Sequence, residues 1–286
     1  MLNKITDRVY YMDKNDETDR PALGLIMGDK FSLAVDAGAS PTHAREFMTK
    51  AKELNAPEFK YVVLTHWHWD HIWGIPAMDF TCIGHINTKE LLDGMRMLSW
   101  EDSAMEARIK SGEMAQFTYD CIKAEMPDSE DRVVGECDVY FSEKLEIDLG
   151  GVTCIVEHVG GDHTPDSTIV YVPEEKVMFL GDCIYGSRYN GEYGYTMEKL
   201  TGMVEKIRKY DAEYYLISHE ELQNKEETLK IFDMQLSIGT LVGKETDSNM
   251  AIAKYKKEFG KDPDEDEIFT INCFANVNRA LSKNQA

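Results

Sequence analysis

The sequence predicts a layered α/β fold from two observations. Short apolar runs rich in β-branched residues alternate with longer segments of helical character along the 286 residues. Of these residues, 43% are hydrophobic, which is enough for a large buried core. The chain shows no internal repeat and no low-complexity linker. Its length alone allows one large domain or two modest ones.

The first strands and the first helix are predicted from apolar runs and turn residues. We expect Asp29-Lys30 to form a hairpin turn, and Ser40-Pro41 to open a helix because Pro is favoured in the first helical turn. The β-branched run that follows is too short for a helix and predicts a buried strand. The expected elements are strands at Arg8–Met12, Leu23–Met27 and Phe31–Val35, a helix from Ser40 to about Leu54, and strands at Tyr61–Thr65 and Thr81–Gly84.

Residues 88–126 are charged, rich in Met and compatible with helix throughout. We expect ordinary helical packing there; the alternative is a hydrophobic wall over a binding site, because thioethers adapt to varied shapes. The strand pattern then resumes, and the chain is expected to be mainly helical beyond Glu220. The expected strands are Val139–Phe141, Lys144–Ile147, Val152–His158, Ser167–Val172, Val177–Leu180 and Tyr214–Ser218, and the clearest helices are Thr196–Tyr210, Lys225–Val242 and about Glu265–Leu281.

The formal net charge of −21 disfavours binding to nucleic acid or to anionic membranes, because such a surface repels phosphate. The six cysteines form no CxxC pair and are expected to be free thiols of a reducing compartment. The first residues lack the apolar core of a signal peptide, and no run of 18 apolar residues predicts a membrane span. We therefore expect a cytoplasmic protein with a small-molecule substrate. A homodimer through the C-terminal helices is an alternative to simple packing of those helices.

Candidate metal ligands are concentrated in the hexapeptide His66-Trp67-His68-Trp69-Asp70-His71, directly after a predicted strand. Imidazole and carboxylate groups are the usual protein ligands of zinc and similar divalent ions. In an extended loop His66 and His68 can point the same way, whereas Asp70 and His71 reach a second point. Two interleaved pairs of ligands predict two metal ions.

Three more residues of ligand type, His163, Asp182 and His219, follow predicted strands further along the chain. Chance explains one or two such placements but hardly seven. The remaining histidines, His43, His85 and His158, are expected to be structural.

With these residues the chain resembles the metallo-β-lactamase superfamily. The HxHxDH motif is intact at His66–His71, and later motifs match at His163 in Gly-Asp-His-Thr-Pro-Asp-Ser, Asp182 in Phe-Leu-Gly-Asp and His219 in Ile-Ser-His. The resemblance covers about residues 5–220 and implies a four-layer αββα sandwich. We expect a catalytic domain over residues 1–220 with a helical insertion at about 88–126. A helical extension over residues 221–286 is expected to pack on the same domain.

The resemblance also implies the role of each ligand. One ion would be held by His66, His68 and His163, the other by Asp70, His71 and His219, and the Asp182 carboxylate would bridge them. The two divalent ions are expected to be Zn²⁺, with Mn²⁺ or Fe as alternatives. They would lower the pKa of a shared water from about 15.7 towards about 7 and so supply hydroxide that attacks a carbonyl.

Asp70 and Tyr185 are the predicted catalytic residues. Asp70 would act through the ion that stabilises the leaving group. Tyr185 lies three residues after the bridging Asp182, where related lactonases place a Tyr against the substrate carbonyl, and a phenol can donate a hydrogen bond to an oxyanion. Asp36 is similar to the family's first acidic motif and is expected to orient the His66–His71 loop; a plain turn-forming Asp is the alternative.

The expected reaction is hydrolysis of a small-molecule ester, lactone, thioester or related carbonyl bond. True β-lactamase activity is an alternative, although class B1 enzymes have Cys at the position of Asp182 and lack His at that of His71. Glyoxalase II shares the ligand set, but we find no basic cluster for the glutathione carboxylates. From other classes, the alternatives are a mononuclear iron oxidoreductase of the persulfide dioxygenase type and a binding protein that retains the fold. Retention of all seven ligands disfavours the binding protein.

Overall fold

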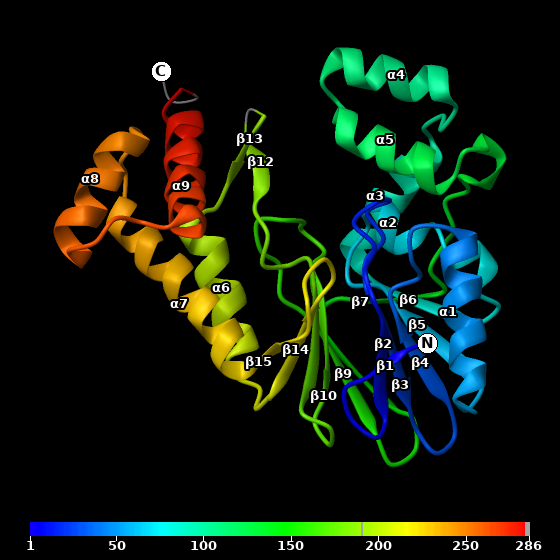
Figure 1. Ribbon diagram of the computed structural model, residues 1–286. Coiled ribbons are helices and arrows are strands. Elements are labelled where there is room, and N and C mark those ends of the chain that lie inside the picture. The colour runs from blue at the N-terminus through cyan, green and yellow to red at the C-terminus, as the bar shows by residue number, and fades with distance from the viewer. Residues whose placement is uncertain (190, 284–286) are drawn as a thin grey trace. The chain divides into compact units, whose positions relative to one another are not determined.

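The computed structural model describes residues 1–189 and 191–283, and the chain divides into two compact units (Figure 1). The first unit comprises Met1–His158, Thr168–Asp182 and Ala212–Leu222, and the second comprises Val159–Ser167, Cys183–Asp211 and Gln223–Ala286. Each unit is therefore built from segments that are distant in the sequence. The expectation that residues 221–286 pack on a domain spanning residues 1–220 stays a prediction.

Two β-sheets form the centre of the first unit. The first sheet has the order β1 to β7, antiparallel from β1 to β4 and parallel from β4 to β7. Its strands are β1 (Asn3–Lys4), β2 (Val9–Met12), β3 (Leu23–Met27), β4 (Ser32–Val35), β5 (Phe59–Val63), β6 (Thr81–His85) and β7 (Val139–Phe141). The second sheet places β14 (Tyr214–Ile217), β11 (Val177–Gly181), β10 (Thr168–Val172), β9 (Thr153–His158) and β8 (Lys144–Asp148) side by side. Only β11 and β14 are parallel among these strands.

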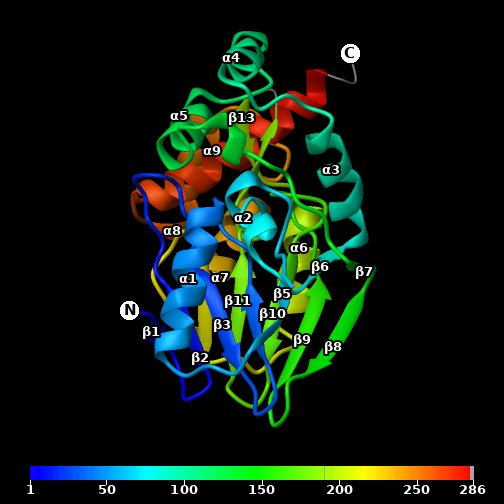
Figure 2. The same cartoon turned by 90° about the vertical axis from the view of Figure 1, so that its right-hand side faces the viewer.

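The two sheets pack face to face because successive residues of a strand point to opposite faces. Leu33 and Val35 of β4 join the core between the sheets, together with Val156 of β9. Ala34, on the opposite face of β4, packs in a second core with Phe47 of helix α1 (Pro41–Glu53). Figures 1 and 2 show α1 lying along the outer face of the first sheet. The first unit thus contains a helix layer and two sheet layers.

Capping residues explain where α1 begins, and the short length of a second helix explains why that helix was not predicted. Ser40 caps α1 by accepting a hydrogen bond from the backbone of His43, and Pro41 follows it as predicted. The hexapeptide is extended only in its first half, because Trp69–Ile72 form the short helix α2. A single helical turn is too short to produce a visible apolar period.

The insertion contains three helices, α3 (Ile86–Arg96), α4 (Asp102–Ser111) and α5 (Gln116–Glu125), which confirms its predicted helical character. Met95, Met105 and Met126 are buried in the core that also contains α1. Ordinary packing therefore accounts for these three side chains, whereas Met97 is exposed.

The second unit is mainly helical. It contains α6 (Met197–Ile207), α7 (Lys225–Val242), α8 (Ser248–Phe259) and α9 (Glu265–Lys283), with α9 packed against α7 and α8. The short strands are β12 (Ser187–Tyr189) and β13 (Glu192–Gly194), which form a hairpin, and β15 (Gln223–Asn224). This hairpin was not predicted, because strands of three residues are too short to show alternation.

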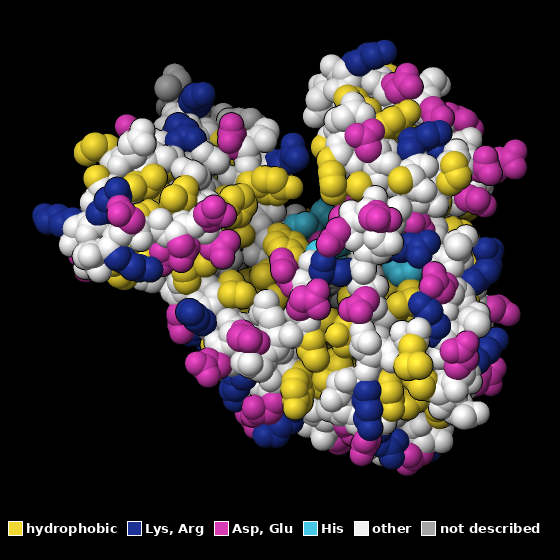
Figure 3. Space-filling view, viewed as in Figure 1, with side chains coloured by type: hydrophobic (Ala, Val, Ile, Leu, Met, Phe, Trp, Pro, Cys, Tyr) yellow, Lys and Arg dark blue, Asp and Glu magenta, His cyan; other side chains and the backbone are white. Residues whose placement is uncertain are grey.

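Three further observations concern the surface charges, the cysteines and the apolar character of the helices. On the face drawn in Figure 3, acidic and basic side chains are interspersed rather than segregated. All six cysteines lie within the described residues and are buried free thiols. Among residues 1–189 and 191–283, no helix has the length and apolar character needed to cross a membrane.

Candidate metal centre

Two imidazoles and two carboxylates meet where strands of the two sheets end in the first unit. Asp70 and His71 lie on α2 after β5, Asp182 follows β11, and His219 follows β14. One ligand atom from each of the four lies within 4.8 Å of the others, and all but the half-buried His219 are buried. Residues up to 149 positions apart are therefore brought together, as the family resemblance implied.

The carboxylate of Asp182 faces three imidazoles. Its Oδ2 atom lies 3.8 Å from Nε2 of His66, 3.7 Å from Nε2 of His71 and 3.5 Å from Nε2 of His219. Nitrogen atoms of two residues of the hexapeptide and of the distant His219 thus converge on one carboxylate oxygen. Such a position suits a carboxylate shared between two cations.

Asp36 and Thr65 determine which nitrogen of His71 and His66 carries the proton. Asp36 accepts hydrogen bonds from the backbone N–H of Thr65 at 2.7 Å and from its hydroxyl at 2.8 Å, and Asp36 Oδ2 lies 2.8 Å from Nδ1 of His71. A carboxylate only accepts, so Nδ1 of His71 donates. The Thr65 hydroxyl donates its hydrogen bond to Asp36, so Nδ1 of His66, 3.1 Å away, donates to the hydroxyl oxygen.

This network leaves the Nε2 atoms of His66 and His71 with lone pairs directed towards Asp182. It also confirms the prediction that Asp36 orients the His66–His71 loop. Asp36 adopts a left-handed backbone conformation, with φ of 64°, at the turn that follows β4.

The four ionisable groups of the cluster shift one another's pKa values in opposite directions. Burial lowers the pKa of His71, but the carboxylates of Asp70, Asp36 and Asp182 raise it well above its usual value. Burial also lowers the pKa of His219, but the carboxylates of Asp182 and Asp70 outweigh burial and raise this pKa to about 11. For Asp70 and Asp182, burial raises the pKa, but the two imidazoles lower it below the usual range. The carboxylates therefore stabilise positive charge at this place, whether a proton or a metal ion carries it.

The donor atoms fit a divalent metal ion. Nε2 of His71 is buried and makes no hydrogen bond, although Oδ2 of Asp70 lies 3.1 Å away. A nitrogen lone pair facing a carboxylate oxygen is repulsive unless a proton or a metal ion lies between them. Two imidazole nitrogens and two carboxylates are ligands that zinc and related ions accept.

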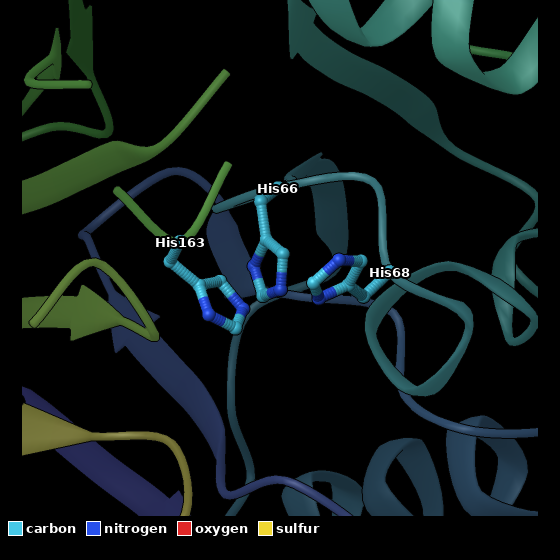
Figure 4. A group of neighbouring side chains, drawn as sticks. All are labelled: His66, His68 and His163. Carbon is cyan, nitrogen blue, oxygen red and sulfur yellow. The ribbon is translucent and has the colours of Figure 1, made fainter. Parts of the chain in front are cut away.

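The three other predicted ligands form a second group, drawn in Figure 4. Ring nitrogens of His66, His68 and His163 lie within 4.8 Å of one another. The rings of His66 and His68 meet edge to face, with centroids 4.7 Å apart. All seven predicted ligands are thus found in one of two groups of ligand atoms.

His163 belongs to a loop of the second unit that its neighbour Asp162 anchors. The buried carboxylate of Asp162 accepts hydrogen bonds from the hydroxyl of Tyr189 at 2.6 Å and from the backbone N–H of Thr196 at 2.7 Å. The loop is therefore tied to β12 and to the start of α6. The ring of Tyr185 lies 6.0 Å from that of His163, so this predicted catalytic residue is close to a predicted ligand.

The histidines expected to be structural have other partners. Nδ1 of His43 accepts a hydrogen bond from the backbone of Ala39 at 3.2 Å, and burial lowers the pKa of His43 to about 3, so its ring is neutral. His85 stacks on His158, with ring centroids 3.9 Å apart. Within the described part of the chain, none of the three belongs to either group of ligand atoms.

One residue near the cluster was missed by the sequence analysis. Oδ1 of Asp19 lies 3.6 Å from Nδ1 of His219. Burial raises the pKa of Asp19 to about 7, and the nearby carboxylate of Asp70 adds to this effect. No local pattern distinguishes Asp19 from Asp13 and Asp16 in the same loop, and its partner is 200 positions away.

Comparison with known proteins shows to which family the chain belongs. Residues 23–219 match the model of the metallo-beta-lactamase superfamily. The human acyl-coenzyme A thioesterase MBLAC2 is 24% identical over 228 residues, which cover 70% of this chain and 77% of that protein. The lactamase-like protein adaB of Aspergillus niger is 40% identical over 54 residues, and the match spans only 17% of the length of that protein and 19% of this chain.

A solved metallo-beta-lactamase from Pontibacter korlensis shares the fold. Its TM-score is 0.56 at 20% identity, with 82% of this chain and 98% of that chain covered. This likeness confirms the fold class predicted from the sequence. The family match covers more than half of the chain, from β3 to His219, and includes the whole hexapeptide. The chain therefore belongs to the metallo-β-lactamase superfamily.

Proposed function

We propose that the protein is a metal-dependent hydrolase that cleaves a small-molecule ester, lactone, thioester or related carbonyl bond at a dinuclear centre. His66, His68 and His163 would hold one ion, and Asp70, His71 and His219 the other. Asp182 would contact both. The observation that carries this proposal is the convergence of three Nε2 atoms on Asp182 Oδ2, because a carboxylate in that position can be shared by two adjacent cations.

Two divalent ions, proposed to be Zn²⁺, would supply hydroxide near neutral pH and polarise a carbonyl oxygen when bound. The chain supplies the orientation of the ligands. Asp36 and Thr65 keep protons on Nδ1 of His71 and His66 and thereby leave both Nε2 lone pairs available. Asp70 contributes a buried carboxylate to the same cluster. No Ser or Cys nucleophile is required.

Tyr185 is proposed to donate a hydrogen bond to the oxyanion that forms on the substrate. Its position beside His163 supports this role. Among the bonds considered, a thioester is supported by the similarity to MBLAC2, which is named an acyl-coenzyme A thioesterase and is matched over 77% of its length. The free thiols are in keeping with a cytoplasmic location, which we also propose.

Metal analysis combined with one substitution tests the proposal. We expect two Zn²⁺ ions per chain and turnover of thioesters or lactones by the reconstituted protein. Asp182→Ala should lower the metal content and reduce turnover by at least about a hundredfold, because both ions lose a ligand. Asp138→Ala is a matched control, since its carboxylate accepts a hydrogen bond from the backbone of Cys82, outside both groups of ligand atoms.

Two results would count against the hydrolase. Turnover of the Asp182→Ala variant equal to that of the unaltered protein would exclude the bridging role. A single iron ion per chain, with oxygen consumed during turnover of a persulfide, would indicate an oxidoreductase instead.

A further inference from the structure

His219 is held between carboxylates on both sides of its ring. Nε2 lies 3.2 Å from Oδ2 of Asp70 and 3.5 Å from Oδ2 of Asp182, within the cluster. Nδ1, on the opposite side of the ring, lies 3.6 Å from Oδ1 of Asp19. The arrangement repeats that of His71, whose Nδ1 faces Asp36 and whose Nε2 faces the cluster.

The loop that carries Asp19 is fixed at its base. Asn15 and Arg20 exchange backbone hydrogen bonds of 2.9 and 3.0 Å, which closes a tight turn over residues 16–19. Arg20 pairs through Nε with the carboxylate of Glu125 at 2.8 Å, and the Glu125 side chain is only 2% exposed. Ala22 donates a 2.7 Å backbone hydrogen bond to Ser218, the residue that precedes His219. These contacts fix the position of the Asp19 loop beside His219.

The backbone of Asp19 is left-handed, with φ of 55°. A tight turn accounts for that conformation, and Asp tolerates it better than most residues other than Gly. The turn alone does not explain why the carboxylate of Asp19 faces the imidazole of His219, which is 200 positions away in the sequence.

We propose that Asp19 is a positioning residue whose carboxylate, 3.6 Å from Nδ1 of His219, attracts the proton on that nitrogen and so keeps Nε2 directed towards Asp70 and Asp182. The proposal rests on the proposed role of His219 as a metal ligand. A neutral imidazole carries one proton, and a carboxylate on the Nδ1 side holds it there, leaving the Nε2 lone pair for a cation. Carboxylate partners of this kind raise the basicity of a ligating imidazole and typically change metal affinity ten- to a hundredfold.

The test compares Zn²⁺ binding by Asp19→Ala, Asp19→Asn and the unaltered protein, using competition with a chelator. We expect Asp19→Ala to weaken the binding of one of the two ions about ten- to a hundredfold and to leave the other ion unaffected. Asp19→Asn should recover part of this loss, because its amide oxygen keeps a partial negative charge that can face Nδ1. Asp16→Ala is the matched control, since Asp16 belongs to the same turn, is 76% exposed and pairs with Lys14.

A second measurement does not depend on affinity. In the zinc-loaded protein, the Nδ1 proton of His219 should give a slowly exchanging NMR signal that Asp19→Ala removes. Unchanged affinity for both ions in Asp19→Ala, with this signal retained, would overturn the proposal while leaving the hydrolase intact. If the unaltered protein bound no metal ion, the proposed function itself would fail, and the role of Asp19 with it.

Discussion

Two aspartate–histidine pairs flank the candidate metal centre, and they differ in how the carboxylate is held. Asp36 is buried at the end of β4, where it accepts two hydrogen bonds from Thr65 and lies 2.8 Å from His71. Asp19 lies in a loop, has 27% of its side chain exposed and is 3.6 Å from His219. Both aspartates have left-handed backbones, so the difference between them lies in the side chains and their surroundings.

From this difference we infer that the cluster has two halves. Asp36 with His71 forms the half that we call rigid, and Asp19 with His219 forms the half that we call adjustable. A buried carboxylate is stable only when its oxygens are well hydrogen-bonded, and Asp36 meets that condition through backbone and hydroxyl donors on the adjacent strand end. The carboxylate of Asp19 retains contact with water, so it needs fewer hydrogen-bond donors from the protein. We therefore expect the Asp36 pair to contribute to folding and the Asp19 pair to act mainly on the ligand.

The largest effect on stability is expected for Asp36→Gly. Glycine keeps the left-handed backbone available, so the change removes the carboxylate without adding strain. The Thr65 donors and Nδ1 of His71 would lose their acceptor in a buried site, which should lower the free energy of unfolding by about 3–5 kcal/mol. Urea unfolding in the presence of a chelator measures this loss without a contribution from metal binding.

Asn55→Gly provides the control for the backbone. Asn55 also has a φ of 55° but is exposed at the end of α1. Its replacement should change stability by less than about 1 kcal/mol. Similar losses in Asp36→Gly and Asn55→Gly would show that the carboxylate of Asp36 is not the stabilising group.

Thr65→Val should have an intermediate effect on the rigid pair. It removes the hydroxyl that donates to Asp36 and accepts from His66, and we expect a loss of about 2 kcal/mol. Thr65→Ser keeps the hydroxyl and should restore most of that loss in the same unfolding experiment. If Thr65→Val is as stable as the unaltered protein, the hydrogen bonds assigned to this hydroxyl do not contribute.

Asp36 and most ligands of the cluster could be predicted from the sequence, because they follow recognisable strands. Asp36 and His66 follow the neighbouring parallel strands β4 and β5, so their proximity follows from the order of the sheet. Asp182 and His219 likewise follow the parallel strands β11 and β14.

Asp19 could not be predicted in this way. It lies in a turn among other acidic residues, and its contact with His219 depends on how the β2–β3 loop folds over a distant strand end. Helix α2 and the β12–β13 hairpin were missed for a different reason. Elements of three or four residues are shorter than the window over which hydrophobic periodicity can be recognised.

Asp19→Gly should have the smallest effect on stability and provides the sharpest contrast with Asp36→Gly. Relief of the left-handed backbone opposes the larger conformational entropy of glycine in the unfolded chain, so we expect a change of less than about 1 kcal/mol, similar to that of Asn55→Gly. Zinc affinity should nevertheless fall as it does in Asp19→Ala, because the carboxylate that faces Nδ1 of His219 is gone. Urea unfolding with a chelator and zinc competition measure the two quantities on the same protein. A loss of stability near that of Asp36→Gly would mean that both carboxylates hold the fold together, and the division into a rigid and an adjustable half would be wrong.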